Sequence, residues 1–141
     1  MGLYKLYKVD KSITTDIPLI DRQHTKLFES FNAVFKALAL AKETPEMLDI
    51  LETMEQYIRH HLSTEEDLML KHNYPKYEPH KKTHEVFIGN VLALKKQTEH
   101  KGVTSDLAQI VKETIGDWFL SHIKIMDMQY VPFLKDVGSE G

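Results

Sequence analysis

The sequence contains no cysteine among its 141 residues. This absence excludes disulfide bonds, thiolate metal sites, iron–sulfur clusters and cysteine nucleophiles, so any bound metal must be held by histidine and carboxylate side chains. Long apolar runs are also missing. No stretch approaches the roughly 18 apolar residues of a membrane span, and the N-terminus lacks the apolar segment of a secretory signal. We therefore expect no membrane association and a cytoplasmic location.

The chain has little net charge of either sign. Eighteen basic and 21 acidic side chains give a formal charge of -3, which provides no overall attraction for nucleic acid. Hydrophobic residues make up 42% of the chain and charged residues 28%, which is typical of a folded globular protein. The length favours a single domain over residues 1–141. The composition leaves the oligomeric state open. Histidine is abundant instead, with eight residues.

Apolar residues recur every three or four positions in four segments that are separated by short breaks, and Ile125 continues the inner face of the last segment. Pro132 is expected to end the last segment. Short loops between long helices make each helix run back along its neighbour. The sequence therefore predicts an all-α fold, an antiparallel up-down-up-down four-helix bundle. Its parts are an irregular leader over 1–18 and helices over roughly 19–41, 45–72, 77–99 and 104–127.

Histidines occupy inner positions of these helices, where an apolar side chain is usual. Glu65 shares the inner face of its helix with one of them, one turn further on. A carboxylate buried among apolar side chains is costly unless it is paired or bound to a metal. The pattern therefore indicates a cation inside the bundle. The five inner histidines are His24, His61, His80, His84 and His122.

The spacing of these residues suits metal binding. His80 and His84 are four residues apart, so they lie within about 40° of each other on a helix. His61 and Glu65 have the same spacing. Asp127, however, follows His122 by five residues, a rotation of about 140° in a regular helix. Either Asp127 lies in a distorted or ended helical turn, or it reaches the site from another side.

The number of candidate ligands favours two ions. A single pair of histidines four residues apart is more often a surface or packing feature, but five inner histidines in four helices are harder to explain in that way. Five histidines and two carboxylates also exceed the needs of one tetrahedral zinc. If Glu65 and Asp127 each bridge both ions, a three-plus-two division of the histidines leaves one coordination position open. An open position on a redox-active pair of ions suggests dioxygen binding.

Four motifs, in this order along the chain, resemble those of the hemerythrin family, in particular its bacterial single-domain members. The resemblance implies a four-helix bundle with two iron ions. In this family His80, His84 and His122 would bind one iron and His24 and His61 the other, with bridges from Glu65, Asp127 and an oxo or hydroxo group. The motifs are Asp21-Arg22-Gln23-His24, His61-Leu62-Ser63-Thr64-Glu65-Glu66, His80-Lys81-Lys82-Thr83-His84 and the segment from Trp118 to Asp127.

The resemblance implies reversible dioxygen binding, for storage, delivery or sensing, with O2 as the partner and no catalytic residue. Trp118 and Phe119 are expected to line the O2 pocket, although simple core packing accounts for them equally well. Glu66 lies off the inner face, so it is either solvated or an acceptor for an imidazole N–H. His60, His72 and His100 fall outside the motifs.

Two other functions stay open. The first is a di-iron redox enzyme that acts on O2, peroxide or nitric oxide and takes electrons from a donor that the sequence does not identify. Carboxylate-rich oxidase bundles usually carry Glu-x-x-His pairs, whereas this chain has His-x-x-x-Glu, which favours O2 binding over catalysis. The second is a metal-free helical interaction module. That function leaves Glu65 and the five inner histidines unexplained.

Overall fold

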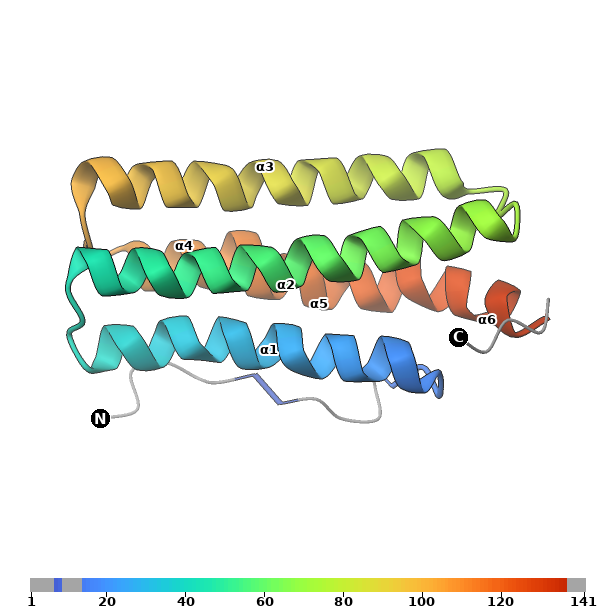
Figure 1. Cartoon of the computed structure of the whole chain (residues 1–141), viewed down its shortest axis with the longest axis horizontal. Helices are drawn as coiled ribbons and strands as arrows, with labels where there is room; N and C mark the ends of the chain where they lie inside the picture. The colour runs from blue at the N-terminus through green and yellow to red at the C-terminus, as the bar shows by residue number, and fades with distance from the viewer. Residues whose placement is uncertain (1–6, 9–13, 137–141) are drawn as a thin grey trace.

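The computed structural model describes residues 7–8 and 14–136, and within these ranges it contains helices and no strand. Consecutive rods run in opposite directions (Figure 1). The second rod packs against the first and the third, and the fourth packs against the first and the third. The predicted antiparallel four-helix bundle is therefore confirmed. The rods are α1 (Pro18–Ala39), α2 (Thr44–Lys71), α3 (Tyr77–Lys101) and a composite fourth rod of α4 (Leu107–Val111), η2 (Lys112–Gly116), α5 (Asp117–His122), η3 (Ile123–Asp127) and α6 (Met128–Asp136).

Local signals explain where the first three rods begin and end. At the start of α2, Glu43 and Glu46 form a reciprocal capping box, which satisfies free backbone amides of the first turn. Asn73 has φ +55° just after α2 and Gly102 has φ +75° just after α3. A left-handed residue at this position is a common way to end a helix. The bounds of these three helices differ from the expected ones by at most two residues.

The fourth rod differs more from its expected range, because it begins at Leu107 rather than 104 and continues to Asp136. The prediction that Pro132 ends the helix is therefore wrong, since Pro132 lies inside α6. The side chains of Tyr130, Val131 and Leu134 are buried in one apolar cluster. Tertiary packing of this kind stabilises a helix against the loss of one backbone hydrogen bond.

The buried side chains form two apolar groups with a polar layer between them. The main core includes Leu27, Leu62 and Phe119. The second group, here called the end cluster, lies toward the ends of the rods near residues 17–20 and 69–74. Along each rod, the inner histidines and carboxylates come between residues of the two groups, so apolar side chains close the polar layer on both sides. The end cluster consists of Ile17, Ile20, Met69, Tyr74, Tyr130, Val131 and Leu134.

Only part of the predicted leader is described, because residues 1–6 and 9–13 lie outside the described ranges. Tyr7 packs its ring against Phe28, at 5.4 Å between centroids, and its hydroxyl donates to Asp117 Oδ1 at 2.8 Å. A Cβ at position 116 would lie 2.0 Å from the Tyr7 hydroxyl oxygen. Gly116 is therefore required for this close approach.

Within the described part of the chain, no helix combines the length and the apolar character that crossing a bilayer requires.

Candidate metal centre

The structure brings all seven predicted ligand residues together in the polar layer. They come from every rod of the bundle, and each is at most 5% exposed to solvent. Their donor atoms form two groups, and within each group one atom per residue lies within 4.8 Å of the others. Glu65 belongs to both. The first group is Glu65, His80, His84 and His122, and the second is His24, His61, Glu65 and Asp127.

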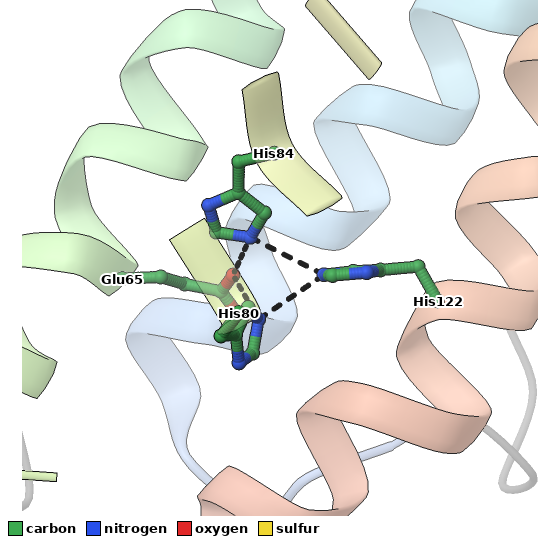
Figure 2. Close-up of side chains that lie close together, drawn as sticks. All are labelled: Glu65, His80, His84 and His122. Carbon is green, nitrogen blue, oxygen red and sulfur yellow. Dashed lines mark hydrogen bonds and ion pairs between the residues drawn. The ribbon is translucent and has the colours of Figure 1, made fainter. Parts of the chain in front are cut away.

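The side chains of the first group point toward one another from three rods (Figure 2). His122 Nε2 lies 3.2 Å from Nε2 of His80 and 3.2 Å from Nε2 of His84. Asp127 Oδ1 lies 3.2 Å from His122 Nε2. Glu65 Oε1 lies 3.3 Å from His84 Nε2. Ligand atoms that share one ion at about 2.1 Å are roughly 3.0 to 3.4 Å apart. The spacing therefore suits a single ion among these donors.

The second group turns the other carboxylate oxygens toward the remaining two imidazoles. Asp127 Oδ2 lies 3.5 Å from His24 Nε2, and Glu65 Oε2 lies 3.5 Å from His61 Nε2. Each carboxylate therefore directs one oxygen to the three-histidine side and its other oxygen to the two-histidine side. Two ions bridged by carboxylates require this arrangement.

A π-helical turn brings Asp127 to the inner face of the fourth rod. η3 spans Ile123–Asp127, and its i to i+5 hydrogen bonding closes one turn over five residues instead of four. His122 and Asp127 therefore lie on the same side. Of the two alternatives for Asp127, the structure has the distorted helical turn. The extra residue also changes the helical register. Ile125, which the apolar periodicity placed inside, is 58% exposed, so that prediction is wrong.

Several buried polar atoms of this layer have no hydrogen-bond partner among the described residues. They include Nε2 of His24, Nε2 of His61 and both carboxylate oxygens of Glu65. Buried polar atoms are normally hydrogen-bonded, and an exception calls for an explanation such as an unseen ion. Nitrogen and oxygen donors that converge without partners fit a divalent transition metal. The residues present therefore fit a metal centre.

The protonation states also suit metal binding. Burial lowers the pKa of His61 well below its ordinary value, and burial likewise lowers the pKa of His122. Neutral imidazole is the form that binds metals. Burial and the nearby Asp127 raise the pKa of Glu65 well above its ordinary value. Burial alone would raise the pKa of Asp127 too, but the adjacent imidazoles hold it well below its ordinary value. Without a metal, the two carboxyl groups therefore carry about one negative charge between them.

Two of the ligand imidazoles have an oxygen acceptor within 3 Å of their outer nitrogen, and a third, His122, has the Thr83 hydroxyl 3.4 Å from Nδ1. His84 Nδ1 lies 2.9 Å from Glu66 Oε2, and His61 Nδ1 lies 2.7 Å from Gln23 Oε1. Because an oxygen acceptor requires the proton on Nδ1, the Nε2 lone pair faces the centre of the bundle. Glu66 is therefore an acceptor rather than a solvated side chain. The role of Gln23 was missed, because nothing in the sequence pairs it with a histidine 38 residues away.

The two aromatic residues expected at the O2 pocket lie on different sides of the layer. Phe119 is fully buried, and its ring stands edge-on to His24 and His61, with centroid distances of 5.6 and 5.8 Å. Trp118 stacks on His122 at 5.0 Å with an interplanar angle of 11°. Phe119 therefore covers the two-histidine side, and Trp118 packs against the three-histidine side.

A pocket of about 420 Å³ opens at the surface beside the three-histidine side. Its lining includes Glu66, His84, Arg59, Lys81 and Glu85. His84 is one of the lining residues, yet only 1% of its surface is exposed to solvent.

The comparisons with known proteins agree on one family. Residues 15–134 match the family model described as the Hemerythrin HHE cation binding domain. The chain is 29% identical to a bacteriohemerythrin of Pseudomonas paraeruginosa over 128 residues, which cover 91% of this chain and 81% of that protein. It is 30% identical to a myohemerythrin of Sipunculus nudus over 124 residues, 88% of this chain and 90% of that one. A crystal structure of wild-type hemerythrin matches with a TM-score of 0.78 at 25% identity, covering 91% of this chain and 97% of that one.

Proposed function

The chain belongs to the hemerythrin family, as its four motifs predicted, and on this premise we propose that it binds dioxygen reversibly at a non-haem di-iron centre. Storage, delivery and sensing of O2 are all compatible with this activity. The observation that carries the proposal is the division of five imidazoles into a group of three and a group of two, with Glu65 and Asp127 between them. In the proposed centre His80, His84 and His122 hold one iron, His24 and His61 hold the other, and Glu65, Asp127 and an oxo or hydroxo group bridge them.

This division gives the two iron positions different numbers of ligands. Three imidazoles, two carboxylate oxygens and one bridging solvent oxygen would offer six ligands to one iron. Two imidazoles with the same bridges would offer five to the other, which would leave a position for dioxygen on the side of His24 and His61. When bound, a ferrous pair supplies the electrons that dioxygen takes up.

The chain's own residues support this role in three ways. Phe119 covers the two-histidine side with an apolar ring and so excludes water from the position proposed for O2. Gln23 and Glu66 fix two imidazoles with the Nε2 lone pair facing inward. Glu65 and Asp127 provide negative charge that offsets the charge of two cations.

The proposal is tested by the optical response of the protein to oxygen. Protein reconstituted with ferrous iron under anaerobic conditions should contain close to two iron atoms per chain. On exposure to air it should develop a new absorption band that disappears under argon, and the cycle should repeat. An irreversible change with consumption of O2, peroxide or nitric oxide would assign the protein to the redox-enzyme alternative. A helical protein that takes up no iron would support the interaction module.

The single-domain organisation and the cytoplasmic location stay predictions. They are checked by limited proteolysis, which should leave one resistant fragment, and by fractionation of cells that express the protein.

A further inference from the structure

The hydroxyl group of Tyr130 lies in apolar surroundings. Tyr130 is fully buried, and within the described residues its hydroxyl has no hydrogen-bond partner. Buried hydroxyl groups almost always have a partner, and an exception in a folded protein needs an explanation. The function proposed above gives Tyr130 no role.

The surroundings of Tyr130 place it between the end cluster and the metal layer. It follows Asp127 by three residues on the same rod, directly after the π-helical turn. Its ring lies 5.4 Å from the ring of Tyr74 and stands edge-on to the imidazole of His80, at 6.1 Å and 87°. Apart from Tyr74, the other members of the end cluster are apolar. The polar groups near Tyr130 are therefore mainly those of the metal layer.

The charges that act most strongly on Tyr130 are those of the two carboxylates. Burial raises the pKa of Tyr130 well above its ordinary value, and Glu65, Asp127 and, after them, Tyr74 raise it further. The hydroxyl therefore keeps its proton at any physiological pH. In this environment it is a hydrogen-bond donor that lies within the field of negative charge and lacks an acceptor among the described residues.

We infer that Tyr130 is a positioning residue of the metal centre, whose hydroxyl donates a hydrogen bond to the carboxylate pair formed by Glu65 and Asp127 when that pair bridges two ions. A carboxylate oxygen has two lone pairs, so it accepts from a hydroxyl while it binds a metal. The inference rests on the proposed function, because the carboxylates bridge only when ions are bound. The hydrogen bond fixes the orientation of a bridging carboxylate and withdraws electron density from it.

The test compares Tyr130→Phe with Tyr77→Phe. Tyr77 also packs against the end cluster, but it is half-buried and Lys81 lies over its ring at 5.8 Å. Each variant and the wild type are loaded with ferrous iron under anaerobic conditions, and the release of iron to a chelator is timed. Loss of a hydrogen bond that orients a metal ligand should make Tyr130→Phe release iron about 10- to 100-fold faster. Tyr77→Phe should match the wild type.

Two further measurements separate this role from a purely structural one. The melting temperature of metal-free Tyr130→Phe should equal or exceed that of the metal-free wild type, because the substitution removes an unpartnered buried hydroxyl. The melting temperature of the iron-loaded variant should fall. The reduction potential of the loaded variant should also fall, because its bridging carboxylate donates more electron density to iron.

Equal iron release by Tyr130→Phe and the wild type would overturn the inference. An equal loss of melting temperature in the metal-free and loaded forms would also overturn it, because the hydroxyl would then serve the fold, through a buried water or through packing, and not the metal centre. If the metal-free variant does not fold, iron release and the reduction potential of the loaded variant test the inference. A wild-type chain that takes up no iron contradicts the proposed function and the inference together, whereas a loaded wild type with an unchanged variant contradicts the inference alone.

Discussion

Replacement of Glu66 by alanine should weaken iron binding through His84. The carboxylate accepts a hydrogen bond from His84 Nδ1 at 2.9 Å, which holds the ring in the tautomer that binds metal. Removing an outer partner of a ligand imidazole typically lowers metal affinity about 10- to 100-fold. The Glu66 side chain is 23% exposed, so water replaces part of the lost bond. We therefore expect the lower end of the range, about tenfold or about 1.4 kcal/mol.

The assay is iron retention against a competing chelator at neutral pH. Glu66→Gln keeps an acceptor oxygen but removes the charge, so its affinity should fall between those of the wild type and Glu66→Ala. Glu85→Ala is the matched control. It removes an exposed carboxylate from the same surface pocket, one residue after His84, and should retain iron as the wild type does.

Two results would refute this reasoning. If Glu66→Ala retains iron like the wild type, the hydrogen bond to His84 does not support a metal ligand. If Glu85→Ala weakens binding as much as Glu66→Ala, the effect comes from the general negative charge of the pocket and not from the hydrogen bond.

Three more predictions concern the core of the centre. The metal-free protein should lose stability as the pH falls below about 6.5, because a histidine such as His61 with a lowered pKa in the fold takes up protons more readily when unfolded. The raised pKa of Glu65 has the opposite effect on stability, but three imidazoles with lowered pKa outweigh it. A melting temperature that is constant between pH 7 and pH 5 would contradict the prediction. Phe119→Ala should destabilise the fold by about 3 to 5 kcal/mol, as measured by denaturant unfolding. It should also speed oxidation of the loaded protein in air, because it admits water to the centre. An unchanged oxidation rate would show that Phe119 does not shield the centre. Glu65→Ala should lose most of its iron by elemental analysis while His100→Ala, at an exposed position, keeps it, and full iron content in Glu65→Ala would exclude the carboxylate bridge.

The fold could be predicted from the sequence because the signals that define its helices lie within each segment. The apolar periodicity and the short breaks between segments were sufficient for the four rods and their antiparallel order. The four-residue spacings of His80 with His84 and of His61 with Glu65 also translate directly into a shared helix face. Ligands placed by a regular helix are therefore visible in the sequence.

The fourth rod was predicted less well because its helical register depends on tertiary packing. A regular helix directs Asp127 away from His122 and directs Ile125 inward. The π-helical turn of η3 reverses both. The sequence predicts that Pro132 ends the helix, yet burial of the residues around it in the end cluster keeps α6 helical. Local propensity could not anticipate these contacts.

The outer partners of the ligands could not be predicted for a different reason. Gln23 and Glu66 each contact a histidine on another helix, and so the pairing depends on how neighbouring rods are rotated. Sequence periodicity predicts the helix face on which a residue lies, but not which residue of the neighbouring helix lies opposite it. The unpartnered hydroxyl of Tyr130 is likewise visible only when the whole end cluster is assembled.

The central claim is that the polar layer holds two metal ions, and diffraction from crystals of the iron-loaded protein at the iron absorption edge tests it most directly. The account predicts two anomalous peaks inside the bundle, one enclosed by His80, His84 and His122 and the other beside His24 and His61, with Glu65 and Asp127 between them. A single peak, or a layer with no peak in which the imidazoles bond to one another or to water, would contradict it.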